Sequence, residues 1–356
     1  MRVPIYIAAA AAWIPPAASA KEAVANGEYS QDDLAGNNVM CLPIAPDGET
    51  ASSMAVAAGR RALQRAAGVI RERIDLVLHA SIYHQGHGHC WTSASFIQRE
   101  LELTGAFAMN IDQASNGGMA AVDLAGAYLE SGRAANVLVT TADRFSSPGF
   151  NRWESTYGVL FGDGATALVL SSQGGFARIV AMESMTDASL EQLYRGTEPL
   201  TSTVQPGPVD LRERQRSYVA EVGLGSVLQR FSVALCEVVG RALAKSGYEL
   251  RDFTKILLPS IGHVLMGLKF LKPLGISADQ TLMSWGSHTG HLGAGDQIAG
   301  IARLVEKSSV APGDRMLLIG AGGGYSVTVA VVEIDSLPEW PDVSTDFELP
   351  ADIRTV

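Results

Sequence analysis

One serine, Ser115, lies where a strand-like stretch (107–112, FAMNID) changes into a helix-like one (119–129, MAAVDLAGAYL). As a helix cap, its hydroxyl would accept a hydrogen bond from an N–H group of the first helical turn. As a nucleophile, it would face a cleft, where the helix N-terminus stabilises developing negative charge. Gly117 and Gly118 permit close approach of the backbone to a substrate. These residues by themselves favour the cap, because a serine nucleophile also needs a base.

A second glycine-rich segment, 286–296 (GSHTGHLGAGD), supplies candidate bases. It contains His288 and His291, and Asp296 follows His291 by five residues. A histidine oriented by a carboxylate is the base that a serine nucleophile requires. We therefore predict Ser115, His291 and Asp296 as catalytic residues and keep His288 as the reserve base. The alternative is that both histidines face solvent from a glycine-rich loop.

Two further glycine-rich segments, 161–167 (FGDGATA) and 320–326 (GAGGGYS), resemble phosphate loops only superficially. Neither matches the G-x-G-x-x-G or the G-x-x-x-x-G-K pattern, so nucleotide binding of those types is not expected. These glycines instead indicate tight backbone approach. The backbone amides of Ser115 and Gly323 are predicted to form an oxyanion hole.

Three histidines and a cysteine (His84, His87, His89, Cys90) gather in the segment 83–91. Imidazole and thiolate groups are zinc ligands, which makes a metal site one interpretation. No Cys-x-x-Cys or acidic companion follows them, however, and short histidine-rich tracts are weak signals for metal. We therefore predict a loop that lines the substrate pocket, with no metal bound.

The composition indicates a globular protein, since 47% of its 356 residues are hydrophobic and 18% are charged. A net charge of −10 argues against nucleic-acid binding, which needs a basic face. It permits docking of an acidic carrier protein on a local cluster such as Lys269 and Lys272, although a solvated helix face is the simpler account. Three cysteines imply no disulfide framework, and a cytoplasmic location is expected.

Strand and helix patterns alternate along the chain. Short apolar runs rich in β-branched residues predict buried strands at 74–83, 136–143, 164–171, 253–263, 314–322 and 325–334. The order helix, strand, short strand, glycine-rich bend, helix, strand, strand occurs in both halves. This duplication predicts two similar α/β layers related by a pseudo-twofold axis, with the bends of Ser115 and His291 meeting near the axis.

We place the boundary between the halves after residue 172, so that 1–172 holds Ser115 and 173–356 holds His291, Asp296 and the glycine loop around Gly323. Residues 175–220 are rich in Pro, Thr and Arg and predict an excursion or lid rather than core. Residues 1–20 fit either a secretory signal or a first strand, and the early prolines favour the strand. No run approaches the roughly 18 apolar residues of a membrane span, so no membrane association is expected.

Over nearly its whole length the chain resembles the thiolase superfamily and, within it, the β-ketoacyl-(acyl carrier protein) synthase III group. The resemblance implies an α/β fold of duplicated αβαβα layers with pseudo-twofold symmetry, forming a homodimer. The segments that carry it are 112–118 (DQASNGG), 158–171 (GVLFGDGATALVLS), 256–263 (ILLPSIGH), 286–296 (GSHTGHLGAGD) and 320–332 (GAGGGYSVTVAVV).

The chain departs from this family at the residues that perform condensation. The family's condensing enzymes carry cysteine at the position of Ser115. They carry Pro-His-Gln-Ala-Asn where this chain has PSIGH, with Ser260 at the histidine and His263 at the asparagine. They carry Gly-Asn-Thr-Ser where GHLG places His291 at the asparagine. That His and Asn stabilise the charge formed as malonyl carrier protein loses carbon dioxide, so the resemblance does not imply decarboxylative condensation here.

The set Ser115, His291 and Asp296 is similar to a subgroup from antibiotic and polyketide pathways, with a Ser or Cys nucleophile, His and Asp. This subgroup includes acyltransferases of the cervimycin and pactamycin type and the daunorubicin starter-unit enzyme. The resemblance implies transfer of an acyl group from a CoA or acyl-carrier-protein thioester through acyl-Ser115 to a hydroxyl or amine of a small-molecule acceptor. No cofactor is implied beyond the thioester donor. The resemblance leaves the acyl group open between a short one and an aromatic one such as 6-methylsalicylyl. Trp153, Tyr157 and Phe161 are candidate pocket residues for an aromatic group, and the alternative is that they are core residues.

Three other functions stay open. A starter-unit synthase would acylate Ser115 and then condense with malonyl carrier protein. A thioester hydrolase would use the same three residues and admit water. A non-catalytic partner subunit would have lost its cysteine, although a retained base and carboxylate argue against that interpretation.

Overall fold

The computed structural model describes residues 3–70, 73–88, 90–202 and 207–340. Its main feature is a nine-stranded mixed sheet in the order β5-β4-β6-β7-β1-β8-β11-β10-β9. The strands are β1 (Ile5–Trp13), β4 (Leu76–Ala80), β5 (Phe107–Ile111), β6 (Asn136–Asp143), β7 (Gly164–Ser171), β8 (Ala177–Thr186), β9 (Lys255–Leu257), β10 (Arg315–Gly322) and β11 (Ser326–Ile334). A two-stranded sheet pairs β2 (Ala17–Ser19) with β3 (Cys41–Pro43).

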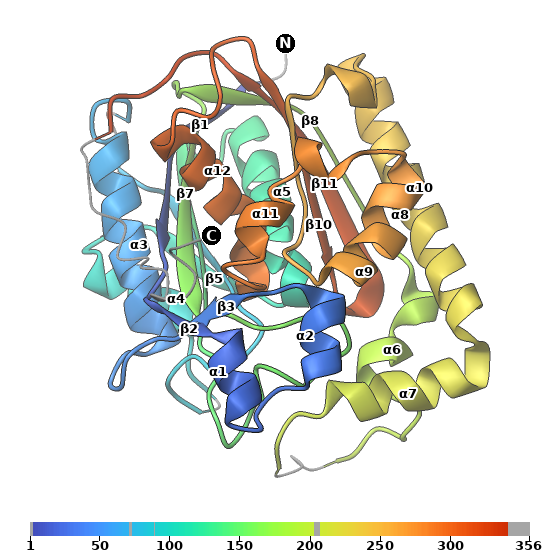
Figure 1. Cartoon of the computed structure of the whole chain (residues 1–356). Coiled ribbons are helices and arrows are strands. Elements are labelled where there is room, and N and C mark those ends of the chain that lie inside the picture. The colour runs from blue at the N-terminus through green and yellow to red at the C-terminus, as the bar shows by residue number, and fades with distance from the viewer. Residues whose placement is uncertain (1–2, 71–72, 89, 203–206, 341–356) are drawn as a thin grey trace.

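Helices cover the outer faces of this sheet and also lie between its two halves, so the molecule is built of layers (Figure 1). The outer layer of one half contains α3 (Ala51–Ala66) and α4 (Ser93–Glu100), and that of the other half contains α8 (Leu224–Ser246). Between the two halves of the sheet lie α5 (Gly117–Glu130) and α12 (Asp296–Glu306), which contact strands of both halves. The remaining helices are α1 (Ala20–Ala25), α2 (Gln31–Asn37), α6 (Gln192–Arg195), α7 (Leu211–Val222), α9 (His263–Met266), α10 (Lys272–Leu274) and α11 (Met283–Gly286).

When each half of the sheet is read outward from the centre, its first four strands correspond in position to those of the other half. The sequence β1-β7-β6-β4 in one half matches β8-β11-β10-β9 in the other. Within the sheet, the two halves are hydrogen-bonded to each other through a short pairing of β1 with β8, which includes Tyr6 opposite Arg178. Helix, sheet, helix pair, sheet and helix therefore follow one another, which confirms the predicted duplicated αβαβα fold with its pseudo-twofold symmetry.

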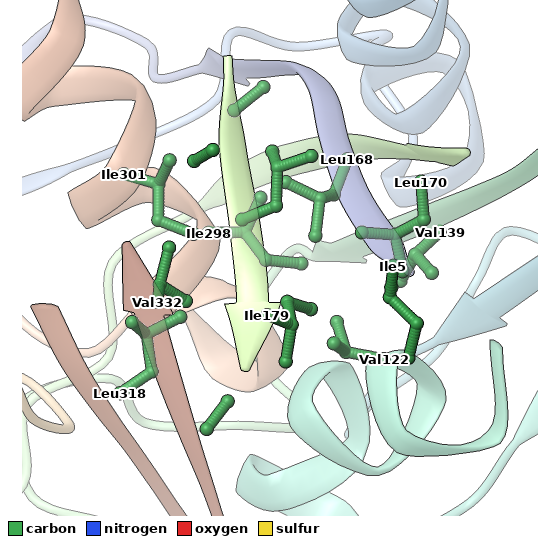
Figure 2. Close-up of a cluster of buried hydrophobic side chains, with 14 of the residues drawn as sticks. Ile5, Val122, Val139, Leu168, Leu170, Ile179, Ile298, Ile301, Leu318 and Val332 are labelled. Carbon is green, nitrogen blue, oxygen red and sulfur yellow. The ribbon is translucent and has the colours of Figure 1, made fainter. Parts of the chain in front are cut away.

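The central layer is held by apolar side chains from both halves (Figure 2). Val122 of α5 and Ile298 of α12 pack there with strand residues such as Leu168 and Val332. Strands β6 and β7 are buried along their whole length, as expected for strands covered by helices on both faces. Strand β1 lies at the centre of this sheet, so the first-strand interpretation of the N-terminal segment is confirmed.

Two expectations about the elements are wrong. The segment 175–220, predicted as a lid, begins with β8, which lies at the centre of the sheet next to β1. Its burial alternates along much of the strand, a pattern that the Pro- and Arg-rich sequence after it obscured. The short strand expected in the second half is also absent, because that segment forms α11 and only Thr281 pairs with Ile256. The boundary at residue 172 stays a prediction.

Within the described ranges, no single helix is both long enough and apolar enough to cross a membrane. The pair α7 and α8 passes that test of length and composition only when taken together, and it is bent by 97°.

Candidate active site

Two short 3-10 turns, one from each half, meet at the centre of the molecule. The first (Ala114–Asn116) precedes α5, and the second (Gly293–Gly295) precedes α12. Their contact depends on glycine, since a Cβ atom at Gly118 would lie 2.2 Å from the carbonyl oxygen of Ala294. The predicted approach of the two bends is therefore present, and it brings the sequences around Ser115 and His291 together.

Ser115 points its hydroxyl at the opposite bend. Its Oγ lies 2.7 Å from Nε2 of His291. The cap of α5 is Asn116, which makes no side-chain capping bond, so the cap interpretation of Ser115 is wrong. Asn116 instead donates to the hydroxyls of Ser326 (3.1 Å) and Thr328 (3.0 Å) on β11. The bend also includes a non-glycine residue with positive φ, Ala114 at 46°, a strained conformation that occurs at functional sites.

His291 donates from Nδ1 to Oδ2 of Asp296 over 2.5 Å, and both side chains are buried. Asp296 also accepts the backbone N–H of Ser260 (2.7 Å) and that of Leu292 (2.8 Å). A carboxylate that accepts from Nδ1 leaves Nε2 of the neutral imidazole without a proton. Nε2 can therefore accept the proton of the Ser115 hydroxyl.

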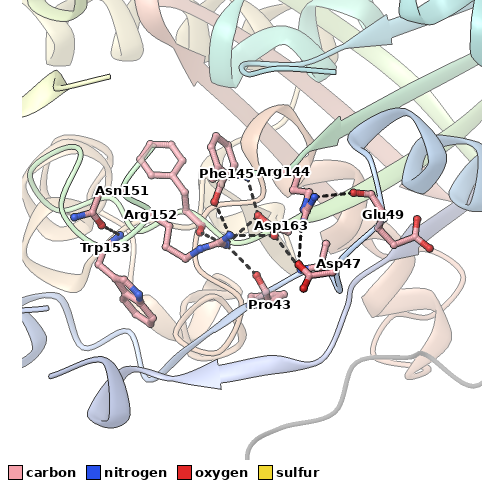
Figure 3. A network of polar contacts seen from close by, with 11 residues as sticks. Pro43, Asp47, Glu49, Arg144, Phe145, Asn151, Arg152, Trp153 and Asp163 are labelled. Atoms are coloured by element: carbon pink, nitrogen blue, oxygen red, sulfur yellow. Dashed lines mark hydrogen bonds and ion pairs between the residues drawn. The ribbon is translucent and has the colours of Figure 1, made fainter. Parts of the chain in front are cut away.

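The segment 160–163 holds the backbone of His291. His291 donates its N–H to the carbonyl of Leu160 (2.8 Å), and its carbonyl accepts from Gly162 (3.0 Å). The next residue, Asp163, is buried and forms a bidentate pair with Arg152, with N–O distances of 2.9 and 3.1 Å (Figure 3). Asp163 also accepts the N–H groups of Ala45 (2.9 Å) and Phe145 (2.8 Å). The FGDG segment thus supports the base, a role that its sequence pattern did not reveal.

Asp143 is a second buried carboxylate that sequence reasoning missed. Its Oδ1 accepts the N–H groups of Ile82 and Tyr83, each over 2.8 Å. Burial raises the pKa of Asp143 to about 7, although these backbone amides oppose the shift. A Cβ atom at Gly293 would lie 2.0 Å from Oδ2 of Asp143, so this carboxylate packs against the bend of His291. As the last residue of a predicted strand, it carried no signal of its own.

The reserve base His288 and the other histidine of the second half, His263, lie away from Ser115. His288 donates from Nδ1 to the carbonyl of Ser284 (2.9 Å), and Nε2 of His263 lies 2.9 Å from Oγ of Ser287. Both histidines line a separate cavity of about 640 Å³ that does not include Ser115. Ser260 contributes its backbone N–H to Asp296, and its hydroxyl packs beside Gly286. The structure therefore brings only His291 of these three histidines to Ser115.

A cavity of about 340 Å³ opens beside Ser115 and His291. Gly323 lies on its wall next to the Ser115 bend, since a Cβ atom there would lie 3.3 Å from Cβ of Ala114. The wall is mainly apolar and aromatic. Its other principal residues are Ile82, Tyr83, Phe150, Val159, Phe161, Tyr194, Val209, Phe231, Ile261, Leu265, Lys269, Phe270 and Tyr325.

The predicted pocket residues are divided between two cavities. Phe161 lines the cavity of Ser115, whereas Trp153 and Tyr157 line a neighbouring cavity of about 830 Å³ that shares Phe150 and Val209 with it. Of the described residues in the segment 83–91, Tyr83 lines the Ser115 cavity, whereas His84, His87 and Cys90 do not. His89 of that loop lies outside the described residues.

Two other expectations concern cations. In the part of the chain that the structure describes, no group of three or more His, Cys, Asp or Glu residues is placed to hold a metal ion. Lys269, a candidate for carrier docking or for a solvated helix face, lines the cavity, while Lys272 is exposed.

Comparisons with known proteins agree with this architecture. The family model for 3-oxoacyl-(acyl carrier protein) synthase III matches residues 109–188, and its C-terminal counterpart matches 243–334. The chain is 27% identical to β-ketoacyl-(acyl carrier protein) synthase III of Clostridium perfringens (strain SM101), over 80% of this chain and 85% of that protein. It is 29% identical to the synthase of the same name from Brucella canis, over 80% and 84%.

Solved structures extend the likeness. The structure of ChlB3, named an acyltransferase, is 31% identical and superposes with a TM-score of 0.89, covering 95% of this chain and all of that one. The synthase III of Pseudomonas aeruginosa PAO1 has the same fold at 20% identity, with a TM-score of 0.76 over 94% and 99% of the two chains. The chain therefore belongs to the ketosynthase III family of thiolase-fold enzymes, which act on acyl thioesters.

Proposed function

We propose that this protein is an acyltransferase. It takes an acyl group from a CoA or carrier-protein thioester onto Ser115 and passes it to a hydroxyl or amine of a small-molecule natural-product intermediate. The observation that carries the proposal is the hydrogen-bonded chain from Ser115 through His291 to Asp296, on the wall of an apolar cavity. The likeness to ChlB3, named an acyltransferase, supports the same reaction class.

In the acylation step, Nε2 of His291 accepts the hydroxyl proton while Oγ of Ser115 attacks the thioester carbonyl carbon. The charge that develops on the carbonyl oxygen is stabilised by the backbone amides of Ser115 and Gly323. The C–S bond then breaks, and the thiolate leaves with the proton from His291. Asp296 holds the imidazole in the tautomer that this step needs and stabilises the imidazolium.

In the transfer step, His291 takes the proton of the acceptor hydroxyl or amine, which attacks the acyl carbon of acyl-Ser115. The C–O bond to Ser115 breaks, and His291 returns the proton to Oγ. Acyl transfer from a thioester to serine yields an oxygen ester, which is less activated than its donor. The intermediate therefore needs a well-positioned acceptor and exclusion of water, and the mainly apolar cavity favours both.

Starter-unit condensation is the second candidate, favoured by the names of the curated relatives, which are β-ketoacyl synthases. It requires groups that stabilise the carbanion left by malonyl decarboxylation. The His and Asn positions of the condensing enzymes are occupied here by Ser260, His263 and His291. Of these three, only His291 lines the cavity of Ser115, and its Nδ1 is bound to Asp296. This arrangement favours transfer to a preformed acceptor over condensation.

The test of the acyl intermediate is the intact mass of the protein after exposure to a panel of CoA and carrier-protein thioesters. We expect one donor class to add the mass of its acyl group, and Ser115→Ala to lose the adduct completely. The variant removes only the Oγ atom and should leave stability near that of the native protein, because Ser115 does not cap α5.

The same measurement decides between the candidates. An adduct that persists in Ser115→Ala would place the nucleophile elsewhere. No adduct with any donor would contradict covalent transfer. It would support either direct transfer without an acyl intermediate or a non-catalytic role. An adduct that water removes as fast as a small-molecule acceptor does would indicate a thioester hydrolase.

We predict that Ser115→Cys acquires acyl groups but releases no carbon dioxide from malonyl carrier protein. A thiol supplies a stronger nucleophile at the same bend, yet the carbanion-stabilising pair is still missing. The measurement is the release of labelled carbon dioxide, with a condensing synthase III as the positive control. Release by Ser115→Cys would contradict the argument from Ser260 and His263 and would support the starter-unit function.

We also propose that the protein is a homodimer formed through the β5 edge. This strand pairs with β4 on one side only and ends the described sheet. Its first residue, Phe107, is 59% exposed, which is unusual for a large apolar side chain on an edge strand. Pairing of two β5 strands would cover both features.

A further inference from the structure

Lys269 is a charged residue in the wall of the cavity beside Ser115. It lies in a π-helical turn (Gly267–Leu271), a rare structure that is frequent at functional sites. Its ammonium lies 5.2 Å from the ring centre of Phe231 and 5.4 Å from that of Tyr325. It donates a hydrogen bond of 3.3 Å to the phenol oxygen of Tyr325. Lys269 is thus held in place by aromatic rings at the wall of the acyl cavity.

Among the described residues that line this cavity there is no carboxylate, whereas two cations, Lys269 and Arg214, are present. Neither forms an ion pair within the part of the chain that the structure describes, and Arg214 donates to the carbonyl of Tyr194 (3.4 Å). An ammonium has three N–H donors, and the long bond to Tyr325 uses one of them. A half-buried cation without a counter-ion lowers the stability of the folded protein. The remaining N–H groups of Lys269 can therefore bind an acceptor oxygen of a ligand in the cavity.

The backbone places Tyr325 beside Lys269 and close to the glycine loop that adjoins the Ser115 bend. Tyr325 has a positive φ of 55°, a strained conformation for a bulky residue and one that gathers at binding sites. It follows Gly323, which lies beside the Ser115 bend, by two residues. Burial raises the pKa of Tyr325, and it raises that of Tyr194 to about 12, so both phenols keep their protons at neutral pH. The phenol of Tyr325 accepts from Lys269 and also interacts with the phenol of Tyr194.

We propose that Lys269 and the Tyr325 phenol bind an oxygen substituent on the acyl group, a carboxylate or a hydroxyl at the end distant from the thioester. The inference rests on the proposed acyl transfer and names its donor class. The acyl body would lie against the aromatic wall, with the carbonyl at Ser115. The shared chemistry of the two substituents is an oxygen that accepts from an ammonium and a phenol.

The test compares donors that differ only at the far end, used as short N-acetylcysteamine thioesters. One pair is hexanoyl and glutaryl, and the other is benzoyl and 3-hydroxybenzoyl. We expect the native protein to acylate faster with the oxygen-bearing member of one pair by about tenfold or more, the contribution of a charged hydrogen bond. Lys269→Met should remove this preference, so that the two members of the pair acylate this variant at similar rates. Lys272→Met, at an exposed position three residues away, is the matched control and should keep the preference.

A second arm measures the same subsite without chemistry. Ketone analogues of the four donors, with the sulfur replaced by a methylene group, are titrated calorimetrically into Ser115→Ala with and without Lys269→Met. We expect the same preference and the same loss. If the native protein forms no acyl adduct, the proposed acyl transfer is overturned. If the ketone analogues bind without a preference for the oxygen-bearing member, this inference is overturned. An unchanged preference in Lys269→Met, or an equal loss for both members of a pair, would also overturn it.

Discussion

Replacing His291 with alanine is expected to slow the acylation of Ser115 by roughly 10³-fold or more, because general-base catalysis commonly contributes 10²- to 10⁴-fold. Nε2 of His291 is 2.7 Å from the Ser115 hydroxyl, whereas His263 and His288 line a separate cavity. The measurement is the single-turnover rate of mass gain with the best donor. His288→Ala is the matched control, since its imidazole binds the carbonyl of Ser284, and its rate should stay near the native value.

Asp296→Asn should slow acylation less than His291→Ala but lower stability more. The carboxylate accepts from His291 and Ser260 on Oδ2 and from Leu292 on Oδ1. An asparagine amide has one acceptor and one donor group, so either orientation places its NH₂ against an N–H donor. The loss of one buried hydrogen bond predicts destabilisation of about 1–3 kcal/mol, measurable by urea denaturation.

The two variants are informative as a pair. Native acylation rates in His291→Ala would contradict a histidine base and leave Ser115 activated by the helix N-terminus alone. An Asp296→Asn protein slower than His291→Ala would mean that Asp296 acts on more than the imidazole.

Gly118→Ala is expected to destabilise the protein by about 3 kcal/mol, the upper part of the range for overpacking. Gly118 lies in the first turn of α5, where helix propensity alone predicts that alanine would stabilise by up to about 1 kcal/mol. Packing opposes this, since the new Cβ atom would lie 2.2 Å from the carbonyl oxygen of Ala294. The contact joins the bends of Ser115 and His291, so acylation should fall together with the free energy of unfolding.

A control for this prediction is Gly240→Ala in α8. A Cβ atom at Gly240 meets nothing within 4 Å, and the residue is exposed. There the helix propensity of alanine acts without opposition, and the midpoint of urea denaturation should rise or stay unchanged. A Gly118→Ala protein that matched Gly240→Ala in stability would show that the two bends move apart without cost.

The strands that the sequence predicted well are those with an unambiguous local pattern. The runs 136–143 and 164–171 are rich in apolar and β-branched residues, are buried throughout, and form β6 and β7 with the predicted bounds. The lid prediction failed for β8 because its burial is one-sided and irregular, and its place at the centre of the sheet depends on pairing with β11 from the far end of the chain. Pairing between segments so distant along the chain leaves little local pattern.

The sequence by itself determined the duplicated fold, through repeated periodicity, and the identity of Ser115, His291 and Asp296 as a serine, a base and a carboxylate on matching bends. Only the tertiary structure decided that the Ser115 hydroxyl meets His291 rather than capping α5, and that His263 and His288 face another cavity. It also brought Asp143 and Lys269 to the site. Composition and spacing record which chemical groups a chain carries. The direction in which each group points depends on contacts between residues far apart in the chain, such as that of Gly118 with Ala294.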